Sequence, residues 1–396
     1  MAIASDAHRG ISRIELYTAT ALMAQLVLLA IWMTRYFVLD PLHTPMVGWD
    51  FAVFWSAARV ALQHGAPMVF SRDLMAAMEA NVTNLGGVGL WPYPPTFLLA
   101  VIPLGLLPFA AAYVVFAIAG VICYTLAVRY LARGVDRTQL VFLAAFPGVA
   151  VTLLAGQNSL FTVAAAGCAL ALLPAHGLLA AGCIVAFAIK PQLGVLFPVV
   201  LICARQWKTL IAAGAFSLAF AAISAAALGF EAWTSFAAFL PEFNRSVVEL
   251  GGRLWNGMPT VFAMSRIAGL STHAAYLAQA IVAVPAIAVV AFLWVRPARH
   301  DLRAAAFVVA TMLVQPYFMY YELCWLVLPI VFLIRDGRTV PLNRVEWAIL
   351  LAAWLAPAQG MLAVALKTPV QIAPAVMIAM LAVVVRRHAL TDAHTA

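Results

Sequence analysis

Residues 93–108, YPPTFLLAVIPLGLLP, form an apolar run that four prolines interrupt. Proline removes a backbone donor and breaks a helix, and lipid cannot replace the lost hydrogen bonds. We therefore predict a re-entrant or juxtamembrane helix here rather than a membrane span. This choice decides on which side of a membrane every later loop lies.

The composition requires a membrane in the first place. The chain has 396 residues, of which 65% are hydrophobic and 10% charged, with a mean hydropathy of +1.00. Soluble domains are about a quarter charged and about half apolar. We expect one polytopic, all-α integral membrane domain over residues 1–396. The first apolar run is too long for a signal peptide, so we expect it to be a true span.

About twelve stretches approach the roughly 20 apolar residues that a membrane-spanning helix needs. Several are short and contain proline. The expected spans are 15–38, 110–129, 138–155, 157–174, 176–190, 192–204, 208–229, 272–295, 302–319, 322–334, 345–359 and 369–385.

The arginines test this count. If the N-terminus is cytoplasmic and 93–108 does not span, six short loops on one side hold 15 of the 23 basic residues, as the positive-inside rule requires. Counting 93–108 as a span would place the 129–137 cluster outside. We expect a bacterial inner membrane, with both termini in the cytoplasm. The formal charge of +8 reflects this asymmetry and does not indicate nucleic-acid binding.

Two longer segments are expected on the outer side, 39–109 and 230–271. They contain several tryptophans and amphipathic stretches such as 50–64, which suit the membrane interface. We see no internal repeat, which disfavours a common secondary transporter.

Asp50 is the most interesting of the acids expected outside. It stands in VGWDFAVFWSAARV, residues 47–60, at the start of an apolar, aromatic helix. It could cap that helix, and a capped carboxylate could also be functional. The other external acids are Asp40, Asp73, Glu79, Glu231, Glu242, Glu249 and Glu322. Asp73 and Glu79 lie in a polar stretch, where we expect water to solvate them.

Three further positions combine polar groups with apolar surroundings. Lys190, in AFAIKPQLG, either lines a site or extends to the interface. Gln157 and Asn158, in AGQNSLF, either contact sugar hydroxyls or cap the following helix. Glu322, beside Tyr321, either belongs to a site or marks the interface. The sequence has no P-loop, dinucleotide fingerprint, nucleophile elbow or metal-spaced histidine cluster.

Six motifs in order resemble one known family. They are GWDFAVFWSAARVAL, YPPTFLLAVIPLGLLP, GQNSLF, KPQLGVLFPVVL, WNGMPT and QPYFMYYEL. Together they cover roughly residues 45–335. The sequence resembles glycosyltransferase family 87, the polyprenol-phosphate-mannose-dependent mannosyltransferases of the GT-C membrane fold.

The resemblance implies a polyprenyl phosphate sugar as donor and inverting transfer at the outer face, with Asp50 as the base. Glu322 departs from the family pattern, which puts the acceptor in question. We expect no metal requirement, because the first loop lacks paired acids. The expected substrate-binding residues are Lys190, Gln157, Asn158, Tyr93, Glu322, Tyr321, Arg59, Asn256 and Arg253.

The predicted function is therefore transfer of a hexose, with mannose as first candidate, to a hydroxyl of a lipid or glycan. The expected partners are the donor, the acceptor and membrane lipids. One alternative is a flippase or transporter that moves the same lipid-linked sugar without chemistry. Another is a structural membrane subunit, which the polar groups gathered on one face disfavour.

Overall fold

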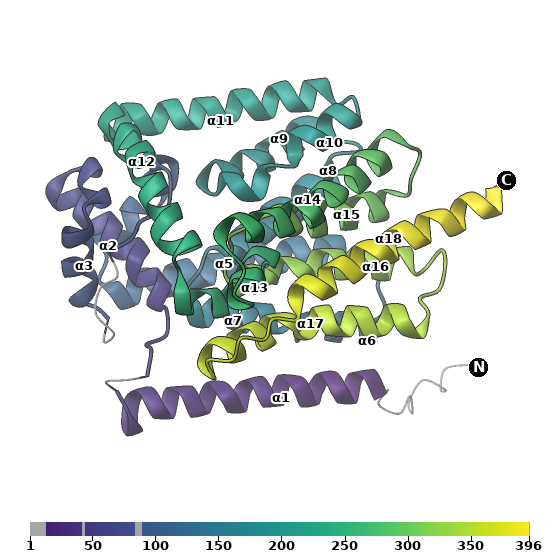
Figure 1. Cartoon of the computed structure of the whole chain (residues 1–396), viewed down its shortest axis with the longest axis horizontal. Coiled ribbons are helices and arrows are strands. Elements are labelled where there is room, and N and C mark those ends of the chain that lie inside the picture. The colour runs from purple at the N-terminus through teal and green to yellow at the C-terminus, as the bar shows by residue number, and fades with distance from the viewer. Residues whose placement is uncertain (1–12, 42–43, 84–88, 396) are drawn as a thin grey trace, which may run out of the picture.

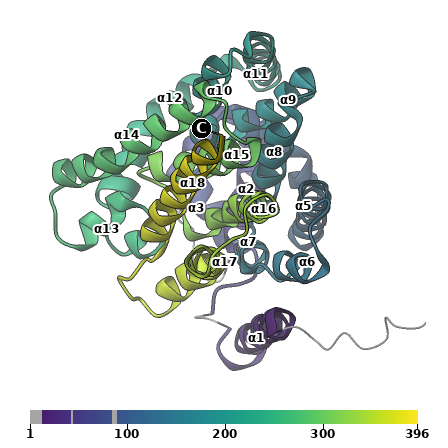
Figure 2. The ribbon, with the colours of Figure 1, turned by 90° about the vertical axis from the view of Figure 1, so that its right-hand side faces the viewer.

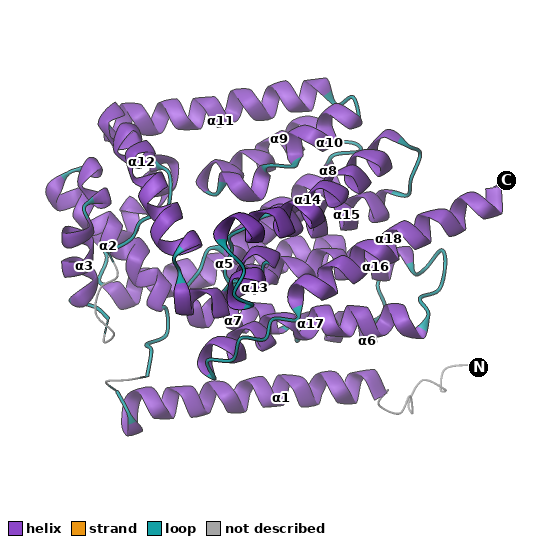
Figure 3. Ribbon diagram, viewed as in Figure 1, coloured by secondary structure: helices purple, strands orange, loops and turns teal. Residues whose placement is uncertain are grey.

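The computed structural model describes residues 13–41, 44–83 and 89–395, and within these ranges all regular structure is helical (Figure 3). Figure 1 labels most of the α-helices. They are α1 (Arg13–Thr34), α2 (Trp49–His64), α3 (Arg72–Ala80), α4 (Pro95–Val101), α5 (Phe109–Leu131), α6 (Arg137–Ala144), α7 (Pro147–Ala155), α8 (Ser159–Leu172), α9 (Gly177–Ile184), α10 (Phe197–Cys203), α11 (Trp207–Leu228), α12 (Phe230–Phe243), α13 (Val261–Ile267), α14 (Thr272–Val295), α15 (His300–Val314), α16 (Val327–Asp336), α17 (Arg344–Ala365) and α18 (Ala373–Thr395).

Short 3₁₀ or π turns extend or join these helices. They are η1 (Arg35–Leu39), η2 (Ala66–Phe70), η3 (Ile102–Leu106), η4 (Val185–Ile189), η5 (Pro191–Gly194), η6 (Asn244–Glu249), η7 (Gly252–Gly257) and η8 (Tyr320–Leu326). Tight turns of this kind are common where a helix ends or the chain changes direction.

Within the described ranges, seven helices are long and apolar enough to cross a membrane. They match seven of the expected spans, and they are Thr18–Leu39, Phe109–Leu131, Arg137–Ala155, Trp207–Leu228, Thr272–Val295, Arg344–Ala365 and Ala373–Leu390. Their outward side chains are apolar; Leu218 on α11, for example, is 73% exposed. Such a surface fits lipid and not water, so the chain is an integral membrane protein.

The expected count of about twelve spans is not confirmed. The expected spans 157–174, 176–190, 192–204, 302–319 and 322–334 form shorter helices or helix pairs. Each is interrupted near a polar or proline-containing turn, for example at Lys190–Pro191 and at Pro316. These interruptions are also where most of the candidate polar residues lie.

The proline-rich run 93–108 folds as α4 followed by η3. Together they form an apolar helix of fewer than 18 residues, Pro95–Leu106, which is not among the span-length helices. Pro103 stands in the first turn of η3, where the missing amide is tolerated. The run packs against α2 and α11.

The main core surrounds α15 and α16. Figure 2 shows both helices enclosed by the others, with α1 at the periphery. Most of α15 is buried, including Phe307 and Met312. A second, aromatic cluster forms around α2 and contains Phe51, Phe54 and Trp91. The two clusters flank the polar residues described below.

Buried charges join the helices at one end of the bundle. The Arg387 side chain is fully buried, donating to Asp336 at 2.6 Å and to Glu346 at 3.0 Å. Arg299 also pairs with Asp336, with Nε and Oδ1 2.7 Å apart. Arg335 donates to the carbonyl of Leu131 at 3.3 Å. Arginines from three of the clusters expected on one side thus lie at one end.

The start of α1 and the end of α18 lie at the same end of the bundle, while α2, α3 and α12 lie at the opposite end (Figure 1). We predict that the end with α2 is extracytoplasmic. Cysteines introduced at positions 83 and 251 in a cysteine-free background should react with an impermeant maleimide in intact cells. A cysteine at 134 should react only after the membrane is opened. Labelling of 134 in intact cells would reverse this orientation.

Candidate active site

Asp50 lies in the first turn of α2 but does not cap it. The N-cap is Gly48, with φ of 79°, and no side chain closes the helix end. Asp50 instead accepts a hydrogen bond from Gln157, with Nε2 and Oδ2 3.0 Å apart. The capping interpretation is therefore wrong, although the carboxylate still benefits from the positive end of the helix dipole.

Two glycines bring the α2 start against the end of α7. The amide of Gly48 donates to the carbonyl of Leu154 at 2.8 Å. Gly156 has φ of +78°, and a Cβ there would lie 2.7 Å from the Gly48 Cα and from the Phe51 Cβ. A larger residue would separate the two segments, because it would need both a strained backbone and space that Phe51 fills.

Gln157 is the centre of the polar network. Its Nε2 donates to Asp50 and also to the hydroxyl of Tyr321, at 3.1 Å. Its Oε1 accepts from the hydroxyl of Tyr93 and from the amide of Asn158, both at 3.3 Å. Partners on both ends of the amide fix its orientation, and with it the position of Asp50.

Lys190 lies between η4 and η5 and is only 6% exposed. Its ammonium donates to Oδ1 of Asn158 at 2.9 Å and forms a salt bridge with Glu322. It also faces the rings of Tyr93 and Tyr321, 5.5 and 5.9 Å from their centroids. The alternative that Lys190 extends to the interface is wrong, since it is bound inside the protein.

The other open alternatives are decided in the same way. Glu322 is 1% exposed and therefore does not mark an interface. Asn158 is the N-cap of α8, but its side chain makes no capping bond and accepts from Lys190 instead. Seven expected site residues thus form one contiguous cluster, from α2, the segment before α4, the α7–α8 turn, η4–η5 and η8. They are Asp50, Tyr93, Gln157, Asn158, Lys190, Tyr321 and Glu322.

Three expected binding residues have other contacts. Arg59 donates to the carbonyl of Gly105 at 3.3 Å and stacks on Trp55, which fastens α2 to η3. The carbonyl of Asn256 accepts from the side chain of Gln371. Arg253 is exposed. None of the three makes a hydrogen bond or ion pair to the cluster in the part of the chain that the structure describes.

Glu79, on α3, was expected to be solvated, and this is wrong. It is 2% exposed, and its Oε2 accepts from the amide of Gly89 at 3.2 Å. It also lies near enough to Asp50 for the two charges to interact. Glu79 is one of two acids on a strongly amphipathic helix, and no local pattern predicts its burial, which depends on how α3 folds back on α2.

An aromatic wall lines the cluster on the side of α2. Trp91 and Phe97 are stacked with centroids 5.5 Å apart, and Tyr93 lies 4.8 Å from Phe97. Phe54 meets all three edge-on. Such rings keep water away from the polar groups and offer flat faces for a sugar ring.

The carboxyl of Asp50 is outside the span-length helices and is held in a partly desolvated position. Burial raises the pKa of Asp50 to about 6, against the opposing effects of the hydrogen bonds from Gln157 and Tyr321 and of the Lys190 charge. A carboxylate with a pKa near the working pH can accept a proton efficiently.

The model of glycosyltransferase family 87 matches residues 91–316, more than half of the chain. The chain belongs to glycosyltransferase family 87. No curated protein and no solved structure matches it.

The match to the glycosyltransferase family model covers only part of the cluster. The match includes Tyr93, Gln157, Asn158 and Lys190. It begins after Asp50 and ends before Tyr321 and Glu322. The roles of these residues are therefore argued from their geometry. Over the described residues no three His, Cys, Asp or Glu side chains converge as a metal site.

Proposed function

We propose that this chain transfers a hexose, with mannose as the first candidate, from a polyprenyl phosphate to a hydroxyl of a lipid or glycan, with inversion. The observation that carries the proposal is the buried cluster of a carboxylate, a lysine and oriented amides inside an apolar helical bundle. Polar groups are costly at such depth and usually serve a site.

Asp50 has the position and protonation behaviour of a general base. The acceptor oxygen attacks the anomeric carbon from the face opposite the phosphate and loses its proton to Asp50. The bond between the anomeric carbon and the phosphate oxygen breaks, and its electron pair leaves with the phosphate. One base is sufficient for this single displacement, since no covalent sugar–enzyme bond forms.

Lys190 is the cation of the cluster that could offset the charge on the leaving phosphate. A phosphodiester that leaves as a monophosphate gains negative charge, and a buried ammonium stabilises it more strongly than one in water. Asn158 and the two tyrosine rings hold the ammonium near the turn of α7 and α8.

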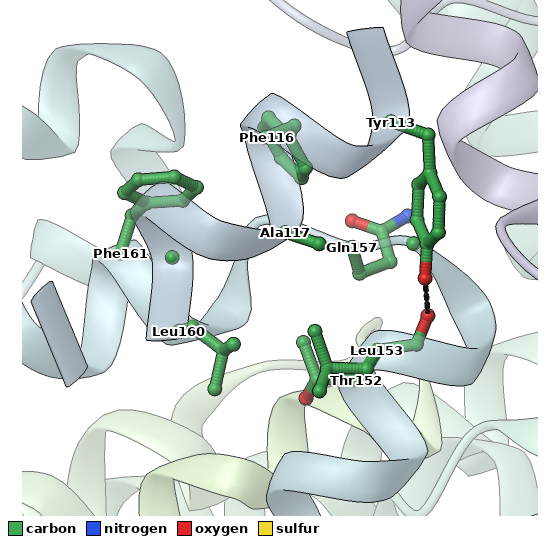
Figure 4. Close-up of a pocket in the computed structure, with 10 residues that line it drawn as sticks. Tyr113, Phe116, Ala117, Thr152, Leu153, Gln157, Leu160 and Phe161 are labelled. Carbon is green, nitrogen blue, oxygen red and sulfur yellow. Dashed lines mark hydrogen bonds between the residues drawn. The ribbon is translucent and has the colours of Figure 1, made fainter. Parts of the chain in front are cut away.

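A small apolar pocket next to Gln157 supports a lipid-linked donor. Figure 4 shows Phe116, Phe161 and Leu160 on one side of it and Gln157 and Tyr113 on the other. The pocket lies between α5, α7 and α8, and Gly120 completes it on α5. The space is only about the size of a water molecule, so we propose that part of an isoprene unit, such as its methyl branch, enters it with the phosphate directed toward the polar cluster.

Gly120→Leu should fill this pocket, because a Cβ at this position already lies 3.3 Å from Phe161. Each methylene excluded from an apolar site costs about 0.8 kcal/mol. We expect KM for a long-chain donor to rise about tenfold, with kcat nearly unchanged. Gly214→Leu on α11 is the control, since a Cβ there meets nothing within 4 Å. Equal KM values for the two variants would place the chain elsewhere.

The pH dependence of kcat/KM should report the ionisation of Asp50. Only the ionised carboxylate can accept the acceptor proton, and burial raises the pKa of Asp50 to about 6. Log kcat/KM should therefore be level above that pH and fall with unit slope below it. Initial rates between pH 4.5 and 8 measure this. A rate that stays level down to pH 4.5 would contradict the assignment.

Transfer in detergent solution tests the proposed function against the flippase alternative. Purified protein is incubated with a radiolabelled polyprenyl phosphate mannose and lipid extract, and the released polyprenyl phosphate and glycosylated product are measured. A transporter needs two compartments and would release no sugar under these conditions. We further propose that the reaction needs no added metal, so EDTA should leave the rate unchanged.

A further inference from the structure

The ammonium of Lys190 is already bound to a protein carboxylate. Glu322 and Lys190 form an ion pair, and both are buried, with side chains 2% and 8% exposed. Taking a lysine and a glutamate together out of water is tolerated because each neutralises the other. Any anion that binds Lys190 must therefore compete with Glu322.

Two buried polar atoms at this ion pair could still form hydrogen bonds. Oε2 of Glu322 and Nδ2 of Asn158 are buried and have no hydrogen-bond partner among the described residues. Buried polar atoms are rarely left without partners. Both residues accept a hydrogen bond from the Lys190 ammonium through their other polar atom. Of the two atoms without a partner, Oε2 is an acceptor and Nδ2 is a donor. A sugar hydroxyl can satisfy one atom of each kind.

The charges in the cluster disfavour an anionic donor if the pair stays intact. Asp50 and Glu322 are two acids against the single cation Lys190. A phosphodiester adds a further negative charge, and a phosphomonoester product adds more. Like charges in a site of low dielectric repel strongly. The site can hold the donor phosphate only if Lys190 turns from Glu322 to the phosphate.

We propose that Glu322 is a displaceable counter-ion of Lys190, which the phosphate of the donor replaces and which then helps to expel the polyprenyl phosphate product. This rests on the proposed function, in which that phosphate is the anion concerned. Once displaced, the Glu322 carboxylate accepts a hydrogen bond from a sugar hydroxyl. After transfer it returns to Lys190 and weakens the hold on the more highly charged product. Glu322 makes no covalent bond and is a positioning residue.

Binding of farnesyl phosphate to protein in nanodiscs tests this, with farnesol as the uncharged probe. Glu322→Gln keeps the size and hydrogen-bonding ability of the side chain but removes its charge. It should tighten farnesyl phosphate binding at least tenfold and leave farnesol binding unchanged. Glu231→Gln, at an exposed acid of α12, removes the same charge outside the site and should change neither affinity.

The Lys190→Met background shows whether the effect acts through the ion pair. There, Glu322→Gln should give no gain in farnesyl phosphate affinity. A gain of the same size would show general charge repulsion and overturn the proposal. So would weaker or unchanged binding in Glu322→Gln, or no binding to any variant at saturating probe. If Glu322→Gln does not fold, Glu322→Asp, which shortens the side chain, should give an intermediate gain.

Kinetics provide the second readout. Glu322→Gln should lower KM for the donor, slow steady-state turnover and produce a burst of product in the first turnover. A purely structural role would lower activity without a burst. If no donor is turned over by any form of the protein, the proposed function fails, while the binding measurements still decide the role of Glu322 toward a phosphate.

Discussion

Asp50→Asn should lower the transfer rate by about 10²–10⁴-fold, the usual loss when a general base is removed. The amide has nearly the same shape as the carboxyl and can still accept the hydrogen bond from Gln157. The network from Tyr93 to Tyr321 should therefore stay in place. Donor affinity should stay the same or rise, because the variant loses proton acceptance and a negative charge but no phosphate contact.

The measurement is the single-turnover transfer rate beside the donor dissociation constant, with Asp73→Asn as the control. Asp73 is an exposed acid on α3 in the same outer segment, so its loss should leave the rate unchanged. The configuration of the product is the second test. An active Asp50→Asn enzyme, or a product that retains the donor's anomeric configuration, would exclude Asp50 as the base and direct attention to Glu79 and Glu322.

Lys190→Met should lower kcat by about 10²–10³-fold, as expected when one group that stabilises a developing anion is removed. Methionine preserves the length and apolar stem of the side chain but cannot offset the charge on the leaving phosphate. The effect should be larger on kcat than on KM, since the phosphate gains charge only as the bond breaks.

The single variant also leaves Glu322 buried without its cation, which destabilises a protein by about 3–5 kcal/mol. The double variant Lys190→Met with Glu322→Gln removes both charges and provides the matched control. It should unfold near the wild-type temperature and still be inactive. A double variant with near-normal turnover would show that Lys190 only balances the charge of Glu322.

The sequence alone was sufficient for the helical membrane class and for naming the seven residues that form the polar cluster. Long apolar runs have few other uses, and seven of the expected spans are helices of span length. Isolated charges in apolar runs identified Asp50, Lys190 and Glu322, because burying such groups is costly and therefore unusual. Four prolines in one run correctly predicted that 93–108 does not form a full span.

The sequence could not decide which residues contact each buried polar side chain. Whether Asp50 capped α2 and whether Lys190 reached the interface depended on contacts between residues more than 100 positions apart, such as Asp50 with Gln157 and Lys190 with Glu322. Local patterns contain no information on such distances. Arg59 shows the same limit, since it was expected to bind substrate and in fact fastens α2 to η3.

Hydropathy and charge thus determined that this chain is a helical membrane protein with a few costly polar residues. Both are properties of each residue in water or lipid and do not depend on the fold. Only the tertiary structure decided that seven of those residues meet, that Glu79 is buried beside them, and that five of the twelve expected spans are short. The physical reason is that the length of a helix and the partner of a buried charge are fixed by long-range packing. For Asp50 that packing is the close approach of Gly48, Phe51 and Gly156.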